Sequence, residues 1–125
     1  MNVLAIDTAS PDASVALAVG GRIFEEALPS ERRASEELLP VLRRVIEAAG
    51  IELGGFDRIA VCAGPGSFTG VRVGLATAWG LSRAAGIPLE TVSTLEAQMS
   101  ASVWWVMGAI PARYPALLKE QSRRP

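Results

Sequence analysis

The sequence predicts an α/β domain in which helices pack on a mixed five-stranded sheet. Three observations lead to this prediction. Short apolar runs bounded by turn residues recur along the first hundred positions. Apolar residues at helical spacing separate the third, fourth and fifth of these runs, which gives the element order β-β-β-α-β-α-β. The chain has 125 residues, 50% of them hydrophobic, which is enough for one modest core and too little for two.

The first three strands are predicted to form a meander. Residues 3–6 are an apolar run that ends at Asp7, as expected for a buried central strand. Residues 14–19 and 22–28 are two further β-prone runs, separated by two adjacent glycines. Paired glycines favour a tight hairpin because both tolerate a positive φ.

The first helix is predicted over residues 35–49, where apolar residues recur at helical spacing and a glycine follows. Pro40 leaves two alternatives. If the helix begins near Glu36 or Glu37, Pro40 falls in the first turn, where proline is tolerated; otherwise it must kink the helix. Leu39 and several alanines lie beside the main stripe, so this helix could have a second apolar face that meets something other than the sheet.

The second half of the chain predicts strand, helix and strand. Residues 59–63 are a continuous run of small apolar residues, typical of a strand covered on both faces. This run leads into a glycine-rich turn, residues 64–70, and a helix over residues 69–85. A last strand is predicted over residues 89–92, and residues 93–94 resemble the cap of a third helix.

The composition excludes several kinds of chemistry. The sequence has no histidine, which removes serine–histidine and cysteine–histidine catalysis and most catalytic zinc sites, and we predict no catalytic or metal-binding residue. The single cysteine, Cys62, lies in an apolar run and is predicted to be a core residue, which favours a reducing, cytoplasmic compartment. A net charge of −1 disfavours autonomous binding of nucleic acid. No apolar segment approaches the roughly 20 residues of a membrane span.

The glycine-rich turn is the most informative stretch. A strand that ends in glycines and opens a helix exposes N–H groups at the positive end of the helix dipole, which can bind an anion. The spacing is G-x-G-x-x-x-G without the lysine of a P-loop, so the evidence for phosphate binding is weak. Both an architectural turn and a nucleotide site remain open. The candidate cofactor-binding residues are Asp7, Thr8, Gly64, Gly66, Ser67 and Thr69.

The second helix contains many small residues, and glycine inside a helix costs about 1 kcal/mol relative to alanine. We therefore expect another backbone to approach closely, either that of the domain's own sheet or that of a second subunit. If a second subunit approaches, Gly74→Leu should block pairing and leave the monomer largely folded. The candidate partner-interface residues are Leu38, Leu42, Val45, Gly70, Val71, Gly74, Leu75 and Ala78.

Four segments resemble the TsaB family, also called YeaZ, in order and spacing: VLAIDTAS, SEELLP, GPGSFTGVRVGLATAWGL and GIPLETVSTLEA. The resemblance covers roughly residues 1–97. It implies an actin-like, ribonuclease H-like lobe over residues 1–98, the first of two related lobes. Residues 99–125 do not match a second lobe, and we predict a divergent tail there, with the second lobe missing.

The resemblance also implies a role in making threonylcarbamoyladenosine in tRNA. In this family's pathway a TsaD-type protein transfers the threonylcarbamoyl group and a TsaE-type protein supplies ATPase function. TsaB itself is considered a non-catalytic scaffold that pairs with TsaD, or with itself, through the two helices. The resemblance therefore predicts a non-enzymatic partner subunit that reaches tRNA only through the complex, with ATP and Mg²⁺ as candidate cofactors at a shared interface.

Two alternatives from other classes stay open. One is half of an actin-like nucleotide-binding or phosphotransfer enzyme that would use Asp7, Thr8 and the glycine-rich turn. Submillimolar binding of ATP with Mg²⁺ would favour it. The other alternative is an inactive truncated fragment with a folded core.

Overall fold

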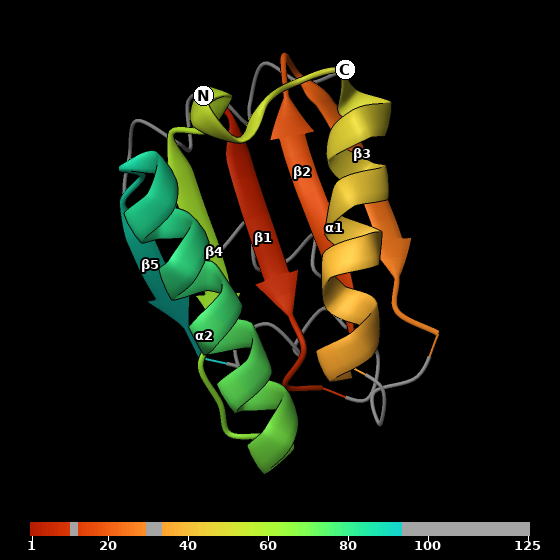
Figure 1. Ribbon diagram of the computed structural model, residues 1–125, viewed down its shortest axis with the longest axis vertical. Helices are drawn as coiled ribbons and strands as arrows, with labels where there is room; N and C mark the ends of the chain where they lie inside the picture. Colours follow the sequence, from red (N-terminus) through yellow and green to blue (C-terminus); the bar gives the residue numbers. More distant parts are fainter. Residues whose placement is uncertain (11–12, 30–33, 94–125) are drawn as a thin grey trace.

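The computed structural model describes residues 1–10, 13–29 and 34–93. Within these ranges the chain forms a five-stranded mixed sheet with two long helices on one face (Figure 1). The predicted α/β class and element order are therefore confirmed. The predicted third helix and the divergent tail lie outside the described residues.

The first three strands form the predicted antiparallel meander. β1 (Val3–Asp7) pairs with β2 (Ser14–Val19), which pairs with β3 (Arg22–Ala27). Gly20 and Gly21 join β2 to β3 with φ angles of 57° and 78°, which confirms the hairpin expected of paired glycines.

The other half of the sheet is parallel. β4 (Arg58–Cys62) lies beside β1, and β5 (Leu89–Val92) lies beside β4. A short 3₁₀ turn that the sequence did not predict, η2 (Leu53–Gly55), precedes β4. The strand order is β3-β2-β1-β4-β5, so β1 is central, and all of its residues are buried. The carboxyl ends of the parallel strands meet at one edge, where α/β sheets commonly bind ligands.

Both helices begin one residue earlier than predicted and end as predicted. α1 (Ala34–Ala49) packs on β2 and β3, and α2 (Phe68–Ala85) packs mainly on β4 (Figure 1). Pro40 lies inside α1 rather than in its first turn, and it faces solvent. Gly86 ends α2 in the left-handed conformation, with a φ of 69°. Neither helix is long and apolar enough to cross a bilayer, nor is any other helix in the described ranges.

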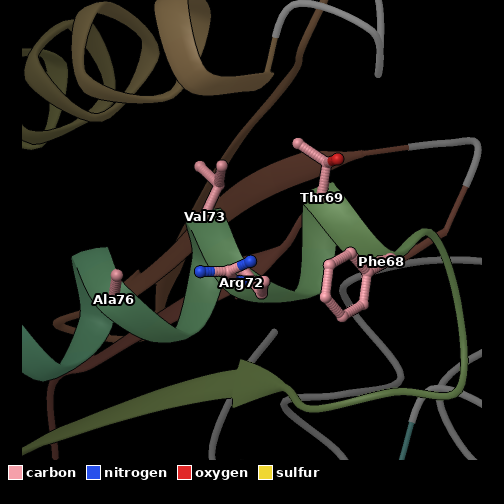
Figure 2. Close-up of a pocket in the computed structure, with 5 residues that line it drawn as sticks. All are labelled: Phe68, Thr69, Arg72, Val73 and Ala76. Carbon is pink, nitrogen blue, oxygen red and sulfur yellow. The ribbon is translucent and has the colours of Figure 1, made fainter.

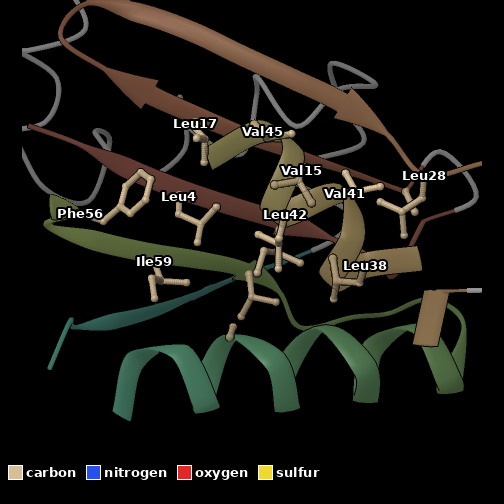
Figure 3. Close-up of a cluster of buried hydrophobic side chains, with 14 of the residues drawn as sticks. Leu4, Val15, Leu17, Leu28, Leu38, Val41, Leu42, Val45, Phe56 and Ile59 are labelled. Atoms are coloured by element: carbon tan, nitrogen blue, oxygen red, sulfur yellow. The ribbon is translucent and has the colours of Figure 1, made fainter. Parts of the chain in front are cut away.

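The main core fills the space between the sheet and the two helices (Figure 3). Because side chains alternate along a strand, one set from β1, β2 and β4 faces the helices and the other set faces the opposite side of the sheet. The opposite side carries a second cluster of mostly small residues, including Ala5, Ala16, Ala60 and Cys62. The large side chains shown in Figure 3 are Leu4, Val15, Leu17, Leu28, Leu38, Val41, Leu42, Val45, Phe56 and Ile59.

Candidate functional site

The glycine-rich turn packs directly on the end of β1. A Cβ atom at Gly66 would collide with the carbonyl group of Ala9. A Cβ atom at Gly70 would collide with the carbonyl group of Thr8, and one at Gly74 with the hydroxyl of the same threonine. Gly66 and Gly70 therefore allow the turn and α2 to contact the backbone directly after β1, and Gly74 leaves room for the hydroxyl of Thr8.

Polar groups at the start of α2 form hydrogen bonds within the protein. Ser67 is the N-cap of the helix, and its Oγ accepts a 3.1 Å hydrogen bond from the N–H of Gly70. The N–H of Ser67 donates to the carbonyl oxygen of Ala9 at 3.0 Å. An anion site would need such donors to point at a ligand, so this geometry favours the architectural interpretation of the turn.

Asp7 and Thr8, two of the candidate cofactor-binding residues, lie at the end of β1 and directly after it, and both are buried and hydrogen-bonded inside the protein. Asp7 Oδ1 accepts hydrogen bonds from the N–H groups of Ala9 and Ser10, at 3.0 and 3.2 Å. Its Oδ2 accepts a 2.6 Å bond from the Ser10 hydroxyl. The Thr8 hydroxyl donates to the carbonyl oxygen of Gly70 at 2.5 Å. A nucleotide or Mg²⁺ would have to replace these bonds.

Cys62 lies beside this network. Burial is the main reason that the pKa of the Cys62 thiol is raised far above its ordinary value. The negative charge of Asp7, and a hydrogen bond between the thiol and that carboxylate, raise it further. The thiol therefore stays neutral, in agreement with its predicted place in the core.

The structure brings all six candidate cofactor residues to one edge of the sheet. Thr69 and Gly66 are exposed there, and Gly64 and Ser67 are half-buried. Among the residues that the structure describes, no three His, Cys, Asp or Glu side chains lie close enough to hold a metal ion. The buried part of this edge, around Asp7 and Thr8, is a packed junction between the end of β1 and the start of α2.

The predicted partner-interface residues lie mainly on the inner faces of the helices. Leu38, Leu42 and Val45 belong to the main core, with 1–4% of their surface exposed. Gly70, Gly74 and Ala78 are also buried.

Six of the eight candidate interface residues are therefore covered by the chain's own fold. The close approach that the small residues of α2 permit is made by β1 and β4, because Gly74 lies against Thr8 and Val61. A side chain at position 74 would meet the hydroxyl of Thr8, so Gly74→Leu is now expected to disturb the monomer itself as well as any pairing. Val71 and Leu75 are half-buried on the flank of α2.

Three large exposed apolar side chains lie on the outer surface of the helix layer. Leu39 on α1 and Phe68 and Trp79 on α2 are 61%, 75% and 60% exposed. Sequence reasoning did not include these three among the interface candidates, although Leu39 was expected on a second apolar face. The signal that could have found them is their position on each helix, away from the buried stripe.

Two shallow hollows lie on this outer surface. One, of about 350 Å³, is lined by residues of the first half of α2 (Figure 2). The side chains of Thr69 and Val73 project from one side of the helix, and the ring of Phe68 projects from another side. The second hollow, of about 370 Å³, lies on α1. The first is lined by Phe68, Thr69, Arg72, Val73 and Ala76, and the second by Leu39, Pro40, Arg43 and Arg44.

Comparison with known proteins identifies the family. Residues 10–118 match the family model described as TsaD: tRNA N6-adenosine threonylcarbamoyltransferase. The tRNA threonylcarbamoyladenosine biosynthesis protein TsaB of Escherichia coli (strain K12) is 38% identical over 109 residues, which are 87% of this chain and 47% of that protein. YeaZ from Pseudomonas aeruginosa has the same fold, with a TM-score of 0.74 at 32% identity, over 92% of this chain and 50% of that chain. The chain belongs to the TsaB (YeaZ) family.

The comparisons confirm the actin-like, ribonuclease H-like fold expected of a TsaB lobe. The chain spans about half the length of the curated relatives it matches. It is also 39% identical over 94 residues to the tRNA N6-adenosine threonylcarbamoyltransferase of Erythrobacter litoralis, covering 75% of this chain and 26% of that protein. The TsaB family and these transferases therefore share sequence over this part of the chain.

Proposed function

We propose that this chain acts in tRNA threonylcarbamoyladenosine biosynthesis as a non-catalytic docking lobe. It pairs with a TsaD-type protein, or with a second copy, through the outer surface of α1 and α2. The TsaB relatives support the pathway. The observation that supports docking is that Leu39, Phe68 and Trp79, three large apolar side chains, are exposed on one helix layer.

The energetic reason for docking is the apolar surface of these side chains. Burying a large apolar side chain that was exposed contributes roughly 1.5–3 kcal/mol. Aromatic rings bury about 150–250 Å² each and dominate many interfaces. Covering Phe68 and Trp79 would therefore supply a large part of the free energy of a protein–protein contact.

Gly80 supports a close approach at the same surface. It lies inside α2 and is exposed, and a Cβ atom placed there would meet nothing within 4 Å. Glycine costs about 1 kcal/mol relative to alanine inside a helix, and packing within the described residues does not require it at this position. A partner helix that crosses α2 closely would require it.

A non-catalytic role is consistent with the edge of the sheet. The carboxylate of Asp7 and the hydroxyl of Thr8 are used in internal hydrogen bonds. The sequence contains no histidine that could act as a general base. In this proposal a TsaD-type partner performs the transfer and a TsaE-type partner hydrolyses ATP, so the lobe reaches tRNA through the complex.

The test is association with and without the exposed apolar side chains. We expect Leu39→Gln combined with Trp79→Gln to weaken binding to a TsaD-type protein, and self-association, at least tenfold. The matched control, Leu39→Met with Trp79→Phe, keeps the apolar surface and should keep the affinity. Sedimentation velocity measures self-association, and interferometry measures binding to immobilised TsaD-type protein. If the variant with Leu39→Gln and Trp79→Gln kept both its affinity and its unfolding temperature, the result would contradict the proposal.

The competing nucleotide function is tested by calorimetry with ATP and Mg²⁺. We expect no heat of binding at submillimolar concentrations from the chain alone. Submillimolar binding that is lost in Asp7→Asn would instead favour an actin-like phosphotransfer role and would contradict the non-catalytic part of the proposal.

A further inference from the structure

We propose that the outer crest of α2 selects a protein partner that presents carboxylates, in preference to a second copy of this chain. The crest consists of Phe68, Arg72, Leu75, Trp79 and Arg83. This inference rests on the proposed docking function and names the chemistry of the partner.

The five crest residues share one side of α2. At about 100° per residue, their positions fall within an arc of about 80°, away from the buried glycines. The two rings are 75% and 60% exposed, both arginines are exposed, and Leu75 between them is half-buried. Phe68 and Trp79 are three helical turns apart, which is about 16 Å along the axis.

Each ring on the crest is paired with an arginine four residues later. The guanidinium carbon of Arg72 lies 5.2 Å from the centre of the Phe68 ring, and that of Arg83 lies 5.4 Å from the Trp79 ring. A guanidinium held over a ring keeps N–H donors available at its edge, and these match a carboxylate in bidentate geometry. The pairing also restricts the arginine side chains before a partner arrives, which lowers the entropy cost of binding.

The charge of α2 favours an acidic partner over the same crest of a second copy. The helix contains Arg72 and Arg83 and neither aspartate nor glutamate. In a symmetric dimer the same surface meets itself, so a contact centred on the crest would bring like charges together. A different protein with carboxylates at matching positions would pair them instead.

The crest also favours protein over nucleic acid. Bases can stack on exposed rings, but a chain with a net charge of −1 has no extended field to attract a polyanion. Two arginines whose positions are about 16 Å apart along the helix axis would neutralise few phosphates. We therefore infer an amphipathic helix whose apolar side chains cover the rings and whose carboxylates, about three turns apart, meet the arginines.

The test uses the full chain and three fluorescent ligands: a synthetic amphipathic helix with leucines flanked by glutamates, the same helix with lysines in place of glutamates, and a single-stranded RNA. Fluorescence anisotropy measures their affinities. We expect the glutamate helix to bind at least tenfold more tightly than the lysine helix. Arg72→Gln combined with Arg83→Gln should remove that difference, and Arg72→Glu combined with Arg83→Glu should reverse it.

Arg22 provides a matched control, because it lies 4.9 Å from the centre of the Phe24 ring on β3 and is not part of α2. Arg22→Gln should leave all affinities unchanged. Sedimentation of the Arg72→Gln, Arg83→Gln variant should show self-association that is equal to, or stronger than, that of the unchanged protein.

The outcomes separate this inference from the docking function. Equal binding of both helices that still depends on Trp79 would overturn the preference for carboxylates and leave docking intact. Tighter binding of RNA that is lost with the two arginines would overturn it in favour of nucleic acid. Binding of no ligand, together with no association of any kind in sedimentation or with a TsaD-type protein, would overturn both proposals.

Discussion

The hydroxyl of Thr8 donates a 2.5 Å hydrogen bond to the carbonyl oxygen of Gly70, and the carbonyl group of Thr8 occupies the space that a Cβ atom of Gly70 would need. These two contacts join the end of the central strand to the first turn of α2. They lie at the glycine-rich turn, for which the sequence left both an architectural role and a nucleotide site open. The glycines therefore serve the packing of a helix on a strand.

The first prediction compares two glycines of α2. Gly70→Ala should lower the free energy of unfolding by about 1–3 kcal/mol, because the added methyl group has no room beside Thr8. Gly80→Ala should raise it by about 1 kcal/mol, because its methyl group meets open space and alanine is the better helix former. Urea unfolding followed by circular dichroism measures both. Equal effects of the two substitutions would contradict the packing described for Gly70.

The second prediction concerns the cap of α2. Ser67→Ala should cost about 1 kcal/mol, because the N–H of Gly70 loses the side-chain oxygen that it contacts at 3.1 Å. Ser67→Asp keeps an acceptor at the N-cap and adds a negative charge near the positive end of the helix, so its stability should be close to that of the unchanged protein. Thermal unfolding distinguishes the two variants. If Ser67→Asp lost as much stability as Ser67→Ala, the result would contradict a capping role for this side chain.

The sequence predicted the elements well because their signals are local. The paired glycines at positions 20 and 21, and the apolar spacing of both helices, depend on neighbours a few residues away. What each helix face contacts does not follow from such local signals. Gly70 signals that a backbone comes close, but the residue it meets, Thr8, is 62 positions away in the chain. The sequence alone could not say whether that backbone belonged to the sheet or to a partner.

The outer surface was hard to predict for a related reason. Trp79 has apolar residues beside it in the sequence, as a core residue would. Its exposure follows only from the sheet lying on the opposite side of α2, which fixes which residues turn inward. Asp7 shows the same limit, because the sequence left a ligand contact and a cap of the following loop both open, whereas its actual partners are the next turn of its own chain and Cys62.

The third prediction tests whether Asp7 is structural. Asp7→Ala should lower the free energy of unfolding by about 2–4 kcal/mol, because buried donors of Ala9 and Ser10 lose their acceptor. Asp57 provides the control: it accepts a 2.7 Å bond from the N–H of Asn2 but is exposed, so Asp57→Ala should cost less than about 1 kcal/mol. Urea unfolding measures both. Stabilisation of the unchanged protein by Mg²⁺, absent in Asp7→Ala, would show a metal ligand instead.

The fourth prediction is a loss of stability at alkaline pH that depends on Cys62. Burial and the nearby Asp7 raise the pKa of this thiol in the folded protein, whereas in the unfolded chain it titrates near pH 9.0. Above that pH the unfolded chain releases a proton that the folded protein keeps. Stability should therefore fall as pH rises, by up to about 1.4 kcal/mol per pH unit, and should not depend on this thiol below that range.

The measurement for Cys62 is a series of urea unfolding midpoints between about pH 7 and pH 10.5, on the unchanged protein and on Cys62→Ala. Other groups titrate over the same range in both proteins, so the difference between the two pH profiles isolates the thiol. The Cys62→Ala profile should be the flatter one above about pH 9, because alanine has no proton to release. Parallel profiles would mean that the folded thiol ionises as readily as the unfolded one, which a buried thiol beside a carboxylate should not do.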